Sequence, residues 1–131
     1  MKVKLLFISI CIFILIVIYF VILFFTGNLY MKIQSFTSPN NEYKITIKSK
    51  GANWPFGEEE IIIYAYENSF KGFFVKTSYK TNIYNDGKIL SEDNFSIKWE
   101  KDSAILTLSG EEQENENIII SFNKDITIKL K

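Results

Sequence analysis

The sequence predicts an all-β domain, a small antiparallel β-sandwich or curled meander of about seven strands, preceded by one N-terminal transmembrane α-helix. Two observations predict this class. Residues 5–25 form one uninterrupted apolar run. Residues 32–131 instead contain short apolar stretches with a period of two, separated by turns rich in Asn, Asp and Gly, and no amphipathic helical pattern.

The apolar run is long enough to cross a bilayer. Residues 5–25 contain no charge, Gly or Pro, and at about 1.5 Å rise per residue they make a helix roughly 31 Å long. All but Ser9, Cys11 and Tyr19 are Leu, Ile, Val or Phe, which favours insertion by about 5–11 kcal/mol. We therefore expect a spanning helix with membrane lipid as its partner.

Two other interpretations of this run have weaker support in the sequence. A cleaved signal peptide has a shorter apolar core and small residues before the cut, whereas Phe25 stands two positions before Gly27. A lipoprotein signal would place a small residue before its cysteine, but Cys11 follows Ile10 inside the run. Both patterns are weak, so Cys11 is interpreted as a small membrane-buried side chain.

The flanking charges predict the orientation. Lys2 and Lys4 precede the helix, and the first charge after it is Lys32. Short lysine-rich flanks stay in the cytoplasm. We therefore expect a single-pass protein of the cell membrane, with residues 1–4 cytoplasmic and the rest of the chain extracytoplasmic.

The extracytoplasmic part divides into a linker and a domain. Residues 26–37 are predicted to be an interfacial linker, with Tyr30 at the headgroup level, although 32–37 also suit a short first strand. Residues 38–131 are predicted to be the all-β domain. Its first turn is Ser38-Pro39-Asn40-Asn41, because Pro and Asn favour turn conformations.

The next two strands have different patterns. Residues 42–50 alternate between an apolar face and a solvated face that carries Lys44, Thr46, Lys48 and Lys50. Residues 58–66 contain three consecutive isoleucines, which predicts a central strand with both faces covered.

A long strand and a hairpin turn follow. In residues 73–84, alternation predicts one face with Phe73, Val75, Thr77, Tyr79, Thr81 and Ile83. Asp86-Gly87 predicts a hairpin turn with a short returning strand over 88–90.

The remaining strands are predicted in pairs. Phe95, Ile97 and Trp99 alternate and form a hairpin with residues 104–109, which places Trp99 inside. Residues 118–122 and 126–130 close the domain.

Composition excludes several functions. Residues 32–131 carry 13 lysines against 15 acidic residues, a net charge of −2, and the chain has no Arg, so no nucleic-acid surface is expected. The chain has no His, and its one Cys lies in the apolar run. Because the usual acid–base and thiol groups are missing, we predict no enzyme and no cofactor, with a hydrolase of envelope polymers as the enzymatic alternative.

Two segments are candidate binding surfaces. Pro55 stiffens the Trp54-Pro55-Phe56-Gly57 loop, so Trp54 and Phe56 either cap the core or form an aromatic platform for a glycan or protein. The loop 110–117 is acidic through Glu111, Glu112, Glu114 and Glu116. It lacks the ligand spacing of calcium loops, so no metal is expected, and a protein partner with a basic site remains an option.

A family resemblance rests on three features: the spanning helix, the segment 38–45 (SPNNEYKI) that opens a β-rich domain, and the Trp-Pro-Phe-Gly loop. Together they resemble small bacterial membrane-anchored proteins of a domain-of-unknown-function family. The resemblance implies an exported β domain and assigns no activity or site residue. We therefore expect non-catalytic binding or assembly in the cell envelope, or alternatively a membrane-tethered immunity or inhibitor protein.

Overall fold

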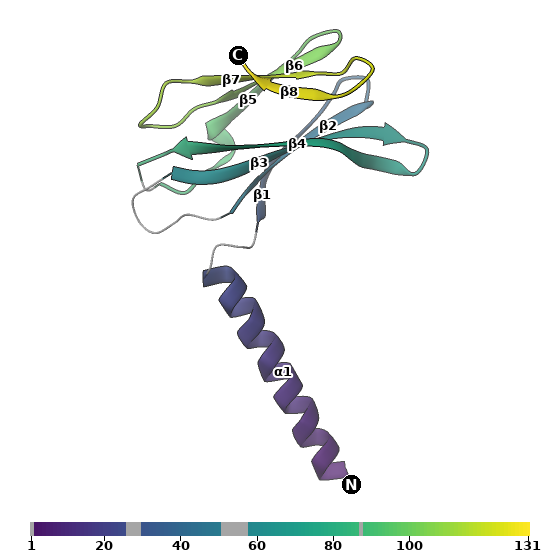
Figure 1. Ribbon diagram of the computed structural model, residues 1–131, viewed down its shortest axis with the longest axis vertical. Helices are drawn as coiled ribbons and strands as arrows, with labels where there is room; N and C mark the ends of the chain where they lie inside the picture. Colours follow the sequence, from purple (N-terminus) through teal and green to yellow (C-terminus); the bar gives the residue numbers. More distant parts are fainter. Residues whose placement is uncertain (1, 26–29, 51–57, 87) are drawn as a thin grey trace.

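The computed structural model describes residues 2–25, 30–50, 58–86 and 88–131 and combines one helix with a β-sandwich (Figure 1). The apolar run forms α1 (Lys2–Phe25). Its segment Leu6–Leu23 is long and apolar enough to cross a membrane, and none of it is buried against the domain. The predicted fold class, an all-β domain after an N-terminal helix, is confirmed.

The first sheet is a meander of four antiparallel strands in the order β1-β2-β3-β4. Its strands are β1 (Met31–Thr37), β2 (Tyr43–Ser49), β3 (Glu58–Ser69) and β4 (Gly72–Tyr84). Residues 31–37, assigned from sequence to the linker or to a short first strand, pair with β2 along their length. β3 lies inside the sheet, as its isoleucine run predicted.

The second sheet repeats this arrangement in the order β5-β6-β7-β8. It contains β5 (Phe95–Trp99), β6 (Ser103–Leu108), β7 (Glu116–Ser121) and β8 (Thr127–Leu130), and the short 3-10 helix η1 (Glu92–Asn94) leads into it. The described strands therefore number eight, against about seven expected. In Figure 1 the first sheet lies between α1 and the second sheet.

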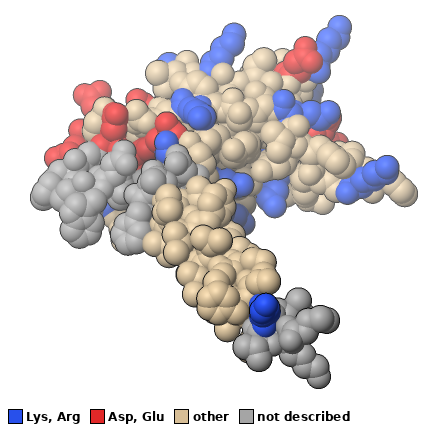
Figure 2. Space-filling view, turned by 60° about the horizontal axis from the view of Figure 1, so that its bottom comes forward, with Lys and Arg blue, Asp and Glu red and all other residues tan. Residues whose placement is uncertain are grey.

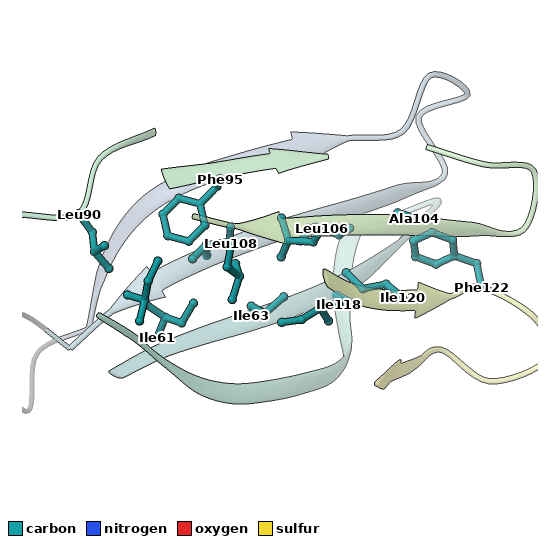
Figure 3. Close-up of a cluster of buried hydrophobic side chains, with 14 residues drawn as sticks. Ile61, Ile63, Leu90, Phe95, Ala104, Leu106, Leu108, Ile118, Ile120 and Phe122 are labelled. Carbon is teal, nitrogen blue, oxygen red and sulfur yellow. The ribbon is translucent and has the colours of Figure 1, made fainter. Parts of the chain in front are cut away.

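The two sheets share one core. The inner faces of β2 and β6 alternate as predicted, and side chains at inner positions of β2, β3, β6 and β7 are completely buried, among them Ile45, Ile63, Leu106 and Ile120. These side chains point into the space between the sheets and form one hydrophobic cluster (Figure 3). Phe122 closes one end of the core by stacking on Tyr43 from the first sheet and Trp99 from the second. The predicted inward position of Trp99 is thus confirmed.

The expected return of the chain after Asp86 is wrong. A turn does form, since the Lys88 amide donates to the Asn85 carbonyl at 2.8 Å and Asp86 has φ 44°. Residues 88–90 are not a strand, however, and the chain crosses to the second sheet. Leu90 is buried at the edge of the core, which favours this crossing over a strand exposed at the edge of β4.

The predicted faces of β4 are wrong in its first half. Tyr66 of β3 pairs with Val75 while Ala65 pairs with Thr77, so Lys76 is an extra residue in β4. This β-bulge reverses the alternation. Phe73 and Val75 consequently share the outer face with Ser78 and Lys80, instead of the inner face with Tyr79.

Candidate functional site

The structure does not unite the residues that the sequence suggested as a binding surface. Trp54 and Phe56 lie outside the described residues. Glu111, Glu112 and Glu114 lie in the loop between β6 and β7, and all three are exposed. The described part of the chain contains no group of three or more acidic, His or Cys side chains placed to hold a metal ion.

Contacts with the end of β4 hold the acidic loop in place. The Tyr84 amide donates to Gln113 Oε1 at 2.7 Å, and the Glu112 amide donates to the Tyr84 carbonyl at 3.3 Å. Glu111 pairs with Lys88, and this hydrogen bond raises the pKa of the Lys88 ammonium. A Cβ at position 110 would overlap the Tyr84 carbonyl oxygen, which explains why a glycine occupies this position. The loop is therefore a structural contact as well as an acidic surface.

A second candidate surface is the outer face of the first sheet, which we call the lysine face. Its lysines are Lys32 on β1, Lys44 and Lys48 on β2, Lys80 on β4, and Lys50, which follows β2 and donates its amide to the Glu60 carbonyl. None of these five lysines has an ion pair within 4 Å among the described residues. Figure 2 shows basic side chains across the side of the domain from which α1 emerges, with acidic side chains mainly toward the left edge.

One row of residues runs across all four strands of this face. Lys32 lies opposite Lys48, Lys48 lies opposite Ile62, and Ile62 lies opposite Lys80. Ile62 is only 5 % exposed although it is on the outer face. Long lysine stems cover apolar neighbours in this way while their ammonium groups remain in water.

Aromatic rings lie beneath three of the lysines. The ammonium of Lys44 is 5.5 Å from the centroid of the Phe73 ring, and that of Lys48 is 5.2 Å from the Tyr64 centroid. Lys80 is 5.9 Å from the Tyr30 centroid. These distances are those of cation–π contacts, so the rings hold the charges at fixed places on the sheet.

Tyr30 connects the lysine face to the helix side of the chain. Its hydroxyl donates a hydrogen bond to Glu60 on β3. This bond raises the pKa of Tyr30 to about 12 and lowers the pKa of the Glu60 carboxyl. The residue that follows the helix–strand junction is therefore fastened to the outer face of the first sheet.

The face remains basic after its acidic groups are counted. Glu58 and Glu60 are its two carboxylates, and each accepts a hydrogen bond from a tyrosine, Tyr84 and Tyr30 respectively. The lysine face thus carries five lysines and two carboxylates. Such an array of ammonium groups is suited chemically to anionic groups spread over a surface.

The outer face of the second sheet is different. Its strand positions, set by the register, are occupied by aliphatic and small polar side chains with two lysines, and by no aromatic residue in the described strands. They are Ser96, Lys98, Ser103, Ile105, Thr107, Asn117, Ile119, Ser121, Thr127 and Lys129. The combination of lysines and aromatic rings is therefore confined to the sheet nearer the helix.

Sequence reasoning found only part of the lysine face. Alternation in residues 42–50 predicted that the lysines of β2 lie on a solvated face, but it did not identify that face as a binding surface. The addition of Lys32 and Lys80 depends on pairing between distant strands, and that of Phe73 depends on the bulge. No family model, curated protein or solved structure matches this chain.

Proposed function

We propose that this chain is a single-pass membrane protein whose β-sandwich is a non-catalytic binding module on the extracytoplasmic side of the cell membrane. The proposal rests on one observation: two different surfaces follow each other directly along the chain. The exposed, apolar helix α1 is followed, after five residues, by a sheet whose outer face is lysine-rich and aromatic.

Other features support a binding role. The chain has no His, and its one Cys lies in α1. Glu59, the buried carboxylate of the described residues, accepts a hydrogen bond from Ser49 inside the sandwich. The exposed faces offer charges and rings for recognition, which suits an envelope protein, glycan or lipid as the bound partner.

Site-directed labelling tests the orientation. In a Cys11→Ser background, Ser96→Cys places a thiol on the exposed outer face of the second sheet, and Lys4→Cys places one in the first turn of α1, before the apolar run. A membrane-impermeant maleimide added to intact cells should label position 96, and position 4 only after permeabilisation. The reverse pattern would contradict the proposed topology.

Crosslinking in the native membrane tests the binding role. A photoreactive residue at Ser78, exposed on the lysine face, should give defined adducts, whereas one at Ser96 should give few. Equal, diffuse labelling from both positions would indicate that neither face binds a partner.

A further inference from the structure

We propose that the lysine face rests on the anionic phospholipid headgroups of the same bilayer that α1 spans. The inference rests on the proposed function and names the partner of its binding face. The sandwich would then lie flat on the membrane, with its first sheet against lipid and its second sheet toward the surroundings.

The short connection limits where the first sheet can go. Phe25 and Tyr30 are five residues apart, so at most about 18 Å separates them. Tyr30 then lies on the outer face of the sheet, bonded to Glu60 and stacked beneath Lys80. Figure 1 shows the first sheet on the helix side of the domain, and the contacts of Tyr30 place the helix end at the lysine face of that sheet.

Charge favours anionic headgroups as the occupant. Lys32 and Lys48 are directly opposite each other in the sheet, and like charges at such positions repel. Neither has a carboxylate partner within 4 Å among the described residues. Phosphate groups beneath the sheet would neutralise both, and each lysine near an anionic surface strengthens binding by about a factor of five.

The aromatic residues favour the same occupant. Tyrosine rings prefer the boundary between headgroups and acyl chains, and Tyr30, Tyr64 and Tyr66 all belong to this face. At the far end of the sheet, Phe70 is fully exposed at the tip of the β3–β4 hairpin, next to Lys71. A ring and an ammonium at one tip suit insertion at a membrane surface better than exposure to water.

The test uses the full chain, reconstituted as one copy per nanodisc so that a second copy cannot cover the face. The Cys11→Ser background carries a fluorophore at Ser78→Cys on the lysine face, or at Ser96→Cys on the second sheet as the matched control. The discs contain phosphatidylcholine alone or with about 30 % phosphatidylglycerol, and a nitroxide on the lipid headgroup quenches nearby fluorophores.

Three results are expected. The fluorophore at position 78 is quenched much more strongly in the anionic discs, whereas the one at position 96 is not. Replacing Lys32, Lys48 and Lys80 by Gln lowers the ratio of docked to undocked protein roughly a hundredfold. The charge-matched control, in which the exposed Lys101, Lys124 and Lys129 become Gln, changes it less than about twofold.

Salt provides a test that needs no substitution of a lysine. About 1 M NaCl shortens the screening length to about 3 Å, so it should release the face of the otherwise unaltered chain. If circular dichroism shows that the triple variant does not fold, the salt measurement alone tests the headgroup contact.

Several outcomes would overturn the inference. Equal quenching at positions 78 and 96, quenching that ignores phosphatidylglycerol and salt, or a dominant protein adduct from position 78 in native membranes would each do so. Extraction of α1 by alkaline carbonate is a separate measurement that addresses the proposed function. A chain that resists carbonate but shows no quenching refutes the headgroup contact alone.

Discussion

The contact between Tyr30 and Glu60 joins the helix side of the chain to the first sheet through a single hydrogen bond. It raises the pKa of Tyr30 to about 12 from 10.0 and lowers that of Glu60 from 4.5. We predict that the absorbance of Tyr30 tyrosinate, isolated as the difference between the wild type and Tyr30→Phe, develops near pH 12. In a Glu60→Gln background the same difference should develop closer to pH 10, because the carboxylate is gone.

The same pKa shifts determine how this contact affects stability. The folded chain holds the Tyr30 proton more tightly than the unfolded chain, so this contribution is complete below about pH 10 and is lost as the pH rises through about 12. The folded chain favours ionised Glu60, so that contribution is complete above about pH 4.5 and is lost as the pH falls through the lowered pKa. Urea midpoints of the wild type and Tyr30→Phe should therefore differ most between these limits. A constant difference across the whole range would contradict this assignment.

A single methyl group added at Gly110 should destabilise the acidic loop strongly. An added Cβ would meet the backbone oxygen of Tyr84, which cannot rotate away as a side chain can. We predict that Gly110→Ala lowers the free energy of unfolding by at least about 2 kcal/mol, measured by chemical denaturation. Glu112→Ala, at an exposed position in the same loop, should change it by less than about 0.5 kcal/mol.

At the level of elements, alternation predicted the inner face of a strand correctly where the pattern within that one strand was sufficient. The inner faces of β2, β5 and β6 follow from a period of two within each strand, and the structure has them as predicted. The pattern could not show the bulge at Lys76, because an extra residue in a strand is recognised only from its partner. Phe73 was therefore assigned to the wrong face.

The candidate site was less predictable than the strands. Lys32, Lys48 and Lys80 come from three strands, and only the pairing registers place them in one row. The acidic loop was visible as a charge run, but its attachment to Tyr84 depends on a contact between residues 29 positions apart. Local composition identifies which residues carry charge and says little about which of them meet.

The crossing between the sheets depends on Asn94. Its side-chain amide donates to the Ser109 carbonyl at 2.7 Å and to Asn85 Oδ1 at 3.2 Å, and its Oδ1 accepts the Ser91 amide at 2.9 Å. We predict that Asn94→Ala lowers the free energy of unfolding by about 1–3 kcal/mol, because it leaves half-buried polar groups unpaired. Asn94→Asp keeps the acceptor for the Ser91 amide but turns a carboxylate oxygen toward the Ser109 carbonyl and Asn85 Oδ1, so it should not restore the stability. Asn123→Ala, in an exposed turn, is the control, and a cost equal to that of Asn94→Ala would refute the assignment.

Taken as a whole, the molecule is a sandwich with two unlike outer faces. The first sheet presents lysines over aromatic rings, whereas the second presents mainly aliphatic and small polar groups. Both sheets nevertheless depend on the same interior cluster. The lysine face lies outside this cluster, so substitution of its lysines leaves the interior packing that holds the domain together in place.

This shared interior leads to a prediction for the whole domain. Leu106 is on β6 and completely buried, in a cluster that includes Ile45, Ile61 and Ile63 of the first sheet. Leu106→Ala should lower the free energy of unfolding by about 2–5 kcal/mol, a large part of the about 5–15 kcal/mol that holds a domain folded.

Because the cluster belongs to both sheets, unfolding should be a single transition. Hydrogen exchange should therefore report the Leu106→Ala loss equally at core amides of β3 and of β6. Ile89→Ala, at a side chain 85 % exposed on the crossing segment, should leave exchange in both sheets within about 0.5 kcal/mol of the wild type. A loss of protection confined to β6 and β7 would mean that the sheets unfold separately, in which case the lysine face could persist on a first sheet that no longer has its partner.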